Sequence, residues 1–196
     1  VIETGDGVVH IFVDASADLS TAIPLIINSK VQRPSVCNSL ETLLVHADVA
    51  HKLLPALAKE LKENGVTVHG CQETLLHIPD GIAATEDDWA TEYLSLDLAI
   101  RVVANLDHAL SHIAEFSTKH TESILTSDAL SAERFLAEVD SSVVMVNSST
   151  RFTDGGEFGF GAEVGISTQK LHARGPMGLR ELTSTKWLVR GSGQVR

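Results

Sequence analysis

Cysteine and basic residues are scarce in this sequence. Cys37 and Cys71 are the only two cysteines among 196 residues, which excludes a disulfide-rich scaffold and favours a reducing, cytoplasmic compartment. Lysine and arginine total 15 against 26 aspartate and glutamate residues, so the formal net charge is −11. No run of basic residues occurs. Nucleic acids and anionic membranes bind concentrated positive charge, so we expect neither as a partner.

Long apolar runs and targeting signals are also missing. No window approaches about 18 consecutive apolar residues, so no membrane-spanning helix is expected. The first residues have neither the basic stretch nor the apolar core of a secretory signal. The chain begins at Val1 and not at methionine, and it runs almost directly into a strand-like stretch. We therefore expect it to be a segment of a longer protein.

Strand-like and helix-like stretches alternate along most of the chain. The β-branched run Val8–Asp14 predicts a strand, and Asp18 is expected to cap the helix that follows. Asp48 and Asp107 are expected to cap two later helices. Apolar runs such as Val143–Val146 lack strict alternation, as in strands covered on both faces. The pattern predicts an α/β fold, with a mostly parallel sheet and flanking helices.

The alternation breaks from Ser148 to about Gly178, where glycine and polar residues dominate. Loops of this length inside a domain are usually functional, and we expect this one to form a wall of a site. The final stretch has one strand-like core, Lys186–Arg190. A lone terminal strand needs a pairing partner, and another subunit is one option.

Common nucleotide and metal motifs are absent. The glycine-rich segment does not read GxGxxG, and no Gly-Lys-Ser/Thr occurs, so most of any nucleotide site is expected elsewhere. His108 and His112 are four residues apart on a predicted helix, but they lack the glutamate of the zincin pattern and an obvious third ligand. We therefore expect surface histidines and no metal site.

The two cysteines differ in context. Cys37 lies between Pro34, which stops a helix, and a predicted strand, with Arg33 four residues before it. Nearby positive charge lowers a thiol pKa, and loops between rigid elements often hold nucleophiles. From the residues alone, Cys37 is either a nucleophile or a buried thiol. Cys71 follows a short strand and is expected to be a core thiol. Glu3, in ETGDG, is by itself only a solvated loop residue.

Three stretches, QRPSVCN, STRFTDGGEFGFGAEVGIST and LHARGPMGL, closely resemble the gamma-glutamyl phosphate reductase family of the aldehyde dehydrogenase superfamily. The resemblance runs from Val1 to about Arg190. It implies an aldehyde dehydrogenase-like catalytic domain over residues 1–180 and an oligomerisation β-arm and tail over residues 181–196. The N-terminal cofactor domain would lie outside the chain. The resemblance fits both a monofunctional reductase and the reductase part of a bifunctional synthase.

The resemblance also implies an activity in proline biosynthesis. Such enzymes use NADPH to reduce gamma-glutamyl 5-phosphate to glutamate-5-semialdehyde and phosphate, through a thioester on the cysteine that Cys37 matches. Glu3 matches the position of the superfamily's general base. Glu92 resembles the glutamate that binds the nicotinamide ribose, although Leu94–Leu96 replace the usual Phe-Gly-Pro after it.

The substrate of that family carries a phosphate and an α-carboxylate. Arg33 and Arg151 are the best candidates to bind these anions, since a guanidinium pairs with either one through two hydrogen bonds. Asn38 and Thr150 are expected as further substrate contacts. A surface ion pair is the alternative for each arginine.

Partners and competing activities follow from the same resemblance. Homo-oligomers and channelling from glutamate 5-kinase are implied, and the chain alone is expected to be inactive. His172 and Arg174 either bind substrate or anchor the long loop. One alternative is a hydrolytic aldehyde dehydrogenase, which would use Glu3 to activate water. Another is a catalytically silent piece that acts only through its arm.

Overall fold

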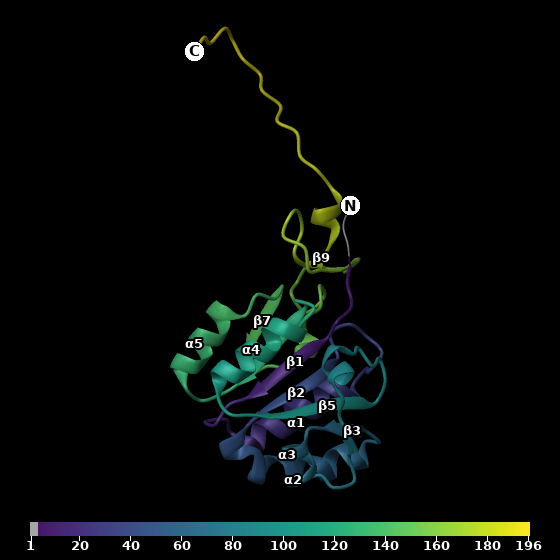
Figure 1. Cartoon of the computed structure of the whole chain (residues 1–196). Helices are drawn as coiled ribbons and strands as arrows, with labels where there is room; N and C mark the ends of the chain where they lie inside the picture. Colours follow the sequence, from purple (N-terminus) through teal and green to yellow (C-terminus); the bar gives the residue numbers. More distant parts are fainter. Residues whose placement is uncertain (1–3) are drawn as a thin grey trace.

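The computed structural model describes residues 4–196. Seven strands form one sheet in the order β4-β3-β5-β2-β1-β6-β7, and they pair in parallel (Figure 1). The helices α1, α2 and α3 cover one face, and α4 and α5 cover the other. The predicted α/β architecture with a parallel sheet is confirmed. No helix of the described residues has the length and apolarity to cross a membrane.

The sheet and its helices occupy the chain from Val9 to Val146. The strands are β1 (Val9–Val13), β2 (Leu40–His46), β3 (Thr67–Gly70), β4 (Ile82–Ala83), β5 (Asp97–Val103), β6 (Thr121–Leu125) and β7 (Val143–Val146). The helices are α1 (Leu19–Val31), α2 (Ala47–Glu63), α3 (Gln72–Leu75), α4 (Leu106–Phe116) and α5 (Ala129–Glu138). Short 3₁₀ turns are η1 (Glu86–Ala90), η2 (Thr150–Phe152) and η3 (Leu179–Leu182).

Two apolar clusters lie on the two faces of the sheet. On the α1–α2 face, Leu53, Leu57 and Leu61 recur at helical spacing along α2 and are almost completely buried. On the other face, Phe12 of β1 and Phe135 of α5 are fully buried in a cluster that also includes residues of α4. Burial of such a side chain is worth about 1.5–3 kcal/mol, so each face is fixed by its own core.

The helix starts differ from the sequence prediction at two of three positions. Asp18 caps α1 as expected, through its side chain. Asp48 and Asp107 do not cap α2 and α4, which begin one residue before each of them. The caps are His46, whose Nδ1 accepts a backbone N–H at 3.1 Å, and Asn105, whose Oδ1 accepts one at 3.0 Å. An earlier side-chain acceptor was available in both cases, so the aspartates lie within the first helical turn.

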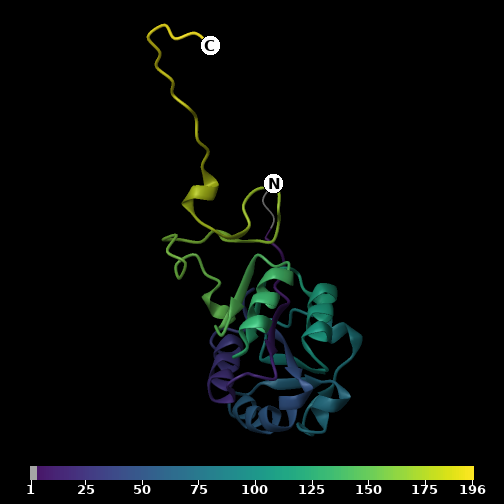
Figure 2. The same cartoon turned by 90° about the vertical axis from the view of Figure 1, so that its left-hand side faces the viewer.

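The segment after β7 is irregular, as expected, and contains a small antiparallel hairpin. Its strands are β8 (Gly165–Ser167) and β9 (Gly175–Met177). The strand expected over Lys186–Arg190 is not formed. Figures 1 and 2 show the C-terminal residues leading away from the sheet, and Trp187 is 92% exposed. An extended segment becomes a strand only when it has a neighbour to pair with, and the described chain offers none here.

The residues that precede the strands meet at one edge of the sheet, because the strands are parallel. Gly7 comes before β1, the loop of residues 32–39 comes before β2, and Glu92 comes before β5. We call residues 32–39 the Cys37 loop. Open α/β sheets commonly bind ligands at the carboxyl ends of their strands. In this chain, the candidate residues lie at the amino edge.

Candidate active site

Gly7 and Glu92 lie against the Cys37 loop, although all three are far apart in the sequence. A Cβ atom added to Gly7 would lie 1.8 Å from the carbonyl oxygen of Cys37, so only glycine fits this approach. The backbone N–H of Gly7 donates to Oε1 of Glu92 at 2.8 Å. The segment before β1 and the segment before β5 are therefore joined beside the thiol.

The thiol of Cys37 is half-buried and its pKa is raised. Burial is the main cause, and the negative charges of Glu163 and Glu92 add to it. The backbone amide of Cys37 and the charge of Arg151 act in the opposite direction. The sequence indicated a pKa lowered by neighbouring positive charge, and the net direction is the reverse. The thiol therefore needs a proton acceptor before it can attack a substrate.

The guanidinium of Arg151 lies near the thiol, and a second guanidinium, that of Arg33, lies near Arg151. The pKa of Arg151 is lowered by burial and by the positive charge of Arg33, which places the two cations close together. The negative charges of Asp154 and Glu163 act on the pKa of Arg151 in the opposite direction. Within residues 4–196, neither arginine has a carboxylate within 4.0 Å, and Nε of Arg151 donates instead to Gln32 at 3.0 Å. Adjacent cations without a close acid partner are suited to an anionic ligand.

Asn38 and Thr150 are buried and hold the Cys37 loop. Nδ2 of Asn38 donates to the carbonyl of Thr153 at 2.8 Å, and Oγ1 of Thr150 donates to the carbonyl of Asn38 at 2.8 Å. Oγ1 of Thr121 continues the network to Oγ1 of Thr153 at 3.0 Å, and Nδ1 of His120 lies 2.9 Å from Oγ1 of Thr121. These contacts fasten the loop to β6 and η2. Direct contact of Asn38 or Thr150 with a substrate stays a prediction.

Glu3 and Glu92 were the acidic candidates. Glu3 lies outside the described residues, so its expected role as a base has no structural counterpart here. Its neighbour Thr4 forms an isolated bridge with Ser167 of β8. Glu92 is half-buried and uses one oxygen to accept the Gly7 amide. Binding of a ribose by Glu92 stays a prediction.

The long segment after β7 reaches the site, as the sequence predicted. Glu163 acts on Cys37, and its Oε2 accepts the backbone N–H of Gly155 at 2.8 Å. This side of the site is therefore formed by residues of the irregular stretch that the sequence predicted. Glu163 itself was not singled out from the sequence, because a loop glutamate gives no local signal.

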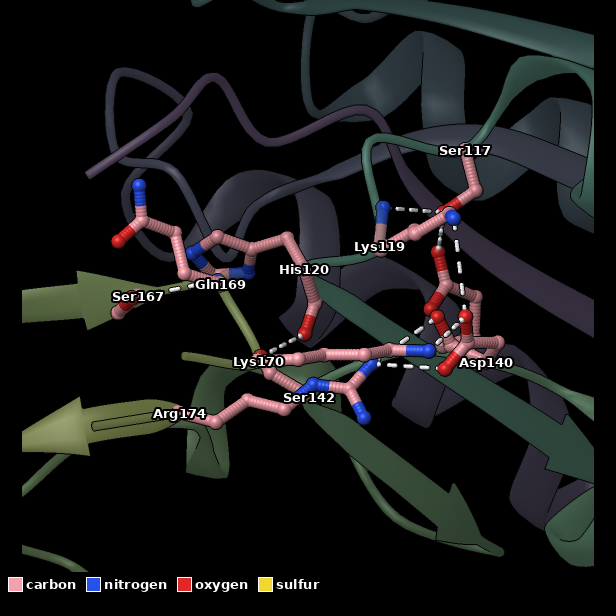
Figure 3. A network of polar contacts seen from close by, with 10 residues as sticks. Ser117, Lys119, His120, Asp140, Ser142, Ser167, Gln169, Lys170 and Arg174 are labelled. Atoms are coloured by element: carbon pink, nitrogen blue, oxygen red, sulfur yellow. Dashed lines mark hydrogen bonds and ion pairs between the residues drawn. The ribbon is translucent and has the colours of Figure 1, made fainter. Parts of the chain in front are cut away.

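Arg174 fastens the same segment to the loop between α5 and β7. Figure 3 shows Lys119, Lys170 and Arg174 converging on Asp140, with nitrogen–oxygen distances of 3.6, 2.7 and 2.9 Å. Hydrogen bonds from Lys170 and Arg174 lower the pKa of Asp140 to about 2. Arg174 therefore anchors the segment, and His172 is exposed.

Both helix histidines were expected on the surface, and for one of them the expectation is wrong. His112 is 2% exposed, and its Nδ1 lies 2.9 Å from Arg101. Burial lowers the pKa of His112 to about 2, so the ring is neutral. His108 is exposed. The four-residue spacing placed both rings on one face of the helix. It did not indicate that Trp89 packs against that face at His112.

Sequence reasoning also missed a buried ion pair next to the Cys37 loop. Nζ of Lys30 lies 2.8 Å from Oε2 of Glu41, and both side chains are fully buried. A charged residue at the start of an apolar strand was a weak signal for Glu41. Nothing in the local pattern indicated that Lys30 turns inward from α1.

Known proteins give a consistent comparison. No protein-family model matches the chain. Over 196 residues it is 66% identical to a gamma-glutamyl phosphate reductase from Clavibacter michiganensis subsp. michiganensis and 60% identical to one from Caldanaerobacter subterraneus subsp. tengcongensis. The matches cover 100% of this chain, but 45% and 47% of those relatives. The chain therefore spans about half the length of the curated relatives that it matches.

Solved structures agree with the sequence comparison. A crystal structure of gamma-glutamyl phosphate reductase from Thermotoga maritima matches with a TM-score of 0.95 and 58% identity, over 100% of this chain and 47% of that chain. An acetylating aldehyde dehydrogenase from Geobacillus thermoglucosidasius matches with a TM-score of 0.70 and 18% identity, over 99% of this chain and 53% of that one. The second likeness concerns the fold alone. The chain has an aldehyde dehydrogenase-like fold, and its resemblance to gamma-glutamyl phosphate reductases is confirmed along its whole length.

Proposed function

We propose that this chain is the cysteine-bearing half of a gamma-glutamyl phosphate reductase, with Cys37 as its nucleophile. The whole protein would reduce gamma-glutamyl 5-phosphate to glutamate-5-semialdehyde and phosphate in proline biosynthesis. The observation that carries the proposal is a half-buried thiol near Arg151, with Arg33 close to that arginine, and neither cation has a close acid partner among the described residues. An acyl phosphate offers that thiol an electrophilic carbon and offers the cations an anion.

The first chemical step follows from these groups. Sγ of Cys37 attacks the acyl carbon, a carbon–sulfur bond forms, and the bond to phosphate breaks with its electrons on the leaving oxygen. The thiol proton passes to a carboxylate, for which Glu92 and Glu163 are the candidates because both charges act on the thiol. Arg33 and Arg151 hold the departing phosphate. The product is a thioester on Cys37.

The binding site for the nicotinamide cofactor is the least complete part of the proposed active site. NADPH, when bound, supplies the hydride that reduces the thioester. The chain has no glycine-rich turn of the dinucleotide-binding type, and Glu92 is its one proposed contact. These residues do not make up a cofactor site, so we assign most of it to sequence outside the chain, and we expect the chain alone to be inactive.

The domain division and the partners are also part of the proposal. Residues 1–180 form the catalytic domain, and residues 181–196 form an oligomerisation arm and tail. The apolar side chains of Trp187, Leu188 and Val189 support that division, because they are largely exposed and suit contact with a second subunit. Substrate transfer from glutamate 5-kinase and a cytoplasmic location complete the proposal.

Phosphate dependence tests the reaction class. Full-length protein that carries this chain is assayed for oxidation of glutamate-5-semialdehyde with NADP⁺, with and without inorganic phosphate. The proposal requires oxidation only when phosphate is present, because phosphate must attack the thioester in the reverse direction. Oxidation without phosphate would identify a hydrolytic dehydrogenase, and a lack of both activities would identify a catalytically silent protein. Either result contradicts the proposal.

A further inference from the structure

Lys30 and Glu41 lie at the two ends of the Cys37 loop. Lys30 belongs to the last turn of α1, and Glu41 is the second residue of β2. Their contact, at 2.8 Å between Nζ and Oε2, therefore closes the base of the loop that carries Cys37. Both side chains of the pair are at 0% exposure. The lysine comes from α1 and the glutamate from β2.

Such a pair is a poor way to stabilise a core. Two charges lose their hydration on burial, and a pair of apolar residues of similar size is often as stable or more so. The cost is visible in the pair itself. Burial raises the pKa of Glu41 to about 7 and lowers the pKa of Lys30, although each partner acts in the opposite direction. The other oxygen of Glu41, Oε1, has no hydrogen-bond partner within the described part of the chain.

The pair also reaches the segment that holds Glu92. The backbone amides of Tyr93 and Leu94 favour the charged form of Glu41, so this segment lies over the carboxylate. Leu94 has a left-handed φ of 56°, which costs a leucine energy and is retained only where contacts require it. The remaining charge that faces the pair is Asp97 of β5, which acts on Lys30. The negative charge of Glu41 in turn helps to raise the pKa of Tyr93.

The Cys37 loop and the Glu92 segment, residues 92–94, therefore both adjoin the Lys30–Glu41 pair. Glu41 links α1 to β2 below Cys37, and it faces the segment whose Glu92 binds Gly7 beside the thiol. A directed ionic hydrogen bond fixes the distance between the ends of a loop more narrowly than apolar contact does. We propose that the Lys30–Glu41 pair is a positioning device, which sets how Cys37 is presented relative to Glu92. The proposal deepens the proposed function, since it concerns the same thiol.

Thiol reactivity tests this positioning without any substrate. In the 196-residue chain, the rates at which iodoacetamide alkylates Cys37 and Cys71 are measured by peptide mass spectrometry, and their ratio is the readout. The variant Lys30→Met/Glu41→Leu removes both charges and keeps the volume, so its thermal stability is expected to stay close to that of the parent. The ratio is expected to rise at least about fivefold, because the loop opens locally while the distant Cys71 is unaffected.

A matched control uses the exposed pair of Lys62 and Asp80, which has a similar nitrogen–oxygen distance of 2.9 Å. Lys62→Met/Asp80→Leu is expected to leave the alkylation ratio unchanged. If the first double variant fails to fold, Glu41→Asp replaces it: the charge is kept, the reach is shorter by one methylene, and the ratio is expected to rise about threefold.

The possible results separate the two proposals. A ratio within about twofold of the parent in a folded variant, or equal acceleration of both cysteines, means that the pair only contributes to stability and overturns the positioning role. Alkylation requires neither NADPH nor acyl phosphate. A protein that lacks reductase activity but shows the rise in ratio would therefore contradict the proposed function and leave the positioning role intact.

Discussion

Two cysteines of similar exposure lie at opposite edges of the sheet, and their surroundings differ. Cys37 precedes β2 and lies among Glu92, Glu163 and Arg151. Cys71 follows β3; its Sγ accepts a backbone N–H at 3.4 Å and lies 3.3 Å from a threonine hydroxyl. The contacts of Cys71 are hydrogen bonds within the fold, whereas charged side chains act on the thiol of Cys37.

The first prediction separates the two thiols. In the full-length protein, Cys37→Ser is expected to lower kcat at least about a thousandfold, because an alcohol is a far weaker nucleophile than a thiol. Cys71→Ser is expected to keep kcat within about threefold, since a serine hydroxyl can make the same local hydrogen bonds at a position away from Cys37. Steady-state reduction of the acyl phosphate is the measurement. Retained activity in the Cys37 variant would remove the central assignment.

His120 gives a prediction about pH. Its ring is buried, and burial lowers its pKa to about 4, below the ordinary value of 6.5. Between these two pH values the unfolded chain binds more protons at this site than the folded chain, so stability is lost as the pH falls. From pH 7.5 to pH 5 this residue is expected to account for about 2 kcal/mol of the loss.

Urea unfolding of the 196-residue chain at both pH values checks this expectation. His120→Asn retains a polar group that can bond to Thr121 but has no proton to gain. Its stability is expected to change less with pH than that of the parent, by about 2 kcal/mol. Glu41 acts in the opposite direction, because its pKa is raised to about 7, and it remains present in both proteins. An identical pH dependence in parent and variant would exclude His120 as the source.

At the scale of elements, the amino edge of the sheet is built from segments that the sequence keeps apart. The Cys37 loop, the Gly7 segment and the Glu92 segment each precede a different parallel strand. The long segment after β7 covers them and is held through Asp140. The site is therefore a meeting of strand ends under one irregular segment.

The anchoring of that segment can be tested at Asp140. Asp140→Asn removes the charge that Lys119, Lys170 and Arg174 share, so residues 163–175 are expected to exchange backbone hydrogens faster. The melting temperature is expected to change little, because exposed ion pairs add little to global stability. Hydrogen-exchange mass spectrometry is the measurement, and Asp80→Asn is the control. Unchanged exchange in residues 163–175 would show that the hairpin β8–β9 needs no such anchor.

At the scale of the whole molecule, the chain spans about half of the reductases that it resembles, 45% in one case and 47% in another. Its C-terminal residues extend away from the sheet (Figure 2). The side chain of Trp187 in this stretch is exposed. A strand over residues 186–190 requires an edge to pair with, and a second subunit is the proposed source of that edge.

The purified 196-residue chain is therefore expected to lack reductase activity while retaining a reactive Cys37. Incubation with NADPH and gamma-glutamyl phosphate is expected to give no oxidation of NADPH above the background rate. The full-length protein at equal concentration is the positive control. Turnover by the short chain would mean that its own residues complete a cofactor site, contrary to the proposal.

The sequence by itself determined the α/β class, the parallel sheet, the irregular segment after β7 and the likeness to a reductase family. Each rests on local information: runs of β-branched residues, helical spacing, glycine content and contiguous motifs such as QRPSVCN. Local information also placed Cys37 in a loop between helix and strand. It failed where an earlier residue competed for the same role, as His46 and Asn105 did at the helix starts.

Only the tertiary structure decided what surrounds that cysteine. The direction of the Cys37 pKa shift depends on burial and on Glu92 and Glu163, which come from distant segments. The burial of His112 and the contact of Lys30 with Glu41 likewise depend on which elements pack together. Desolvation and charge interaction are set by distance in space, and a single sequence does not record distances between segments that meet only when the sheet forms.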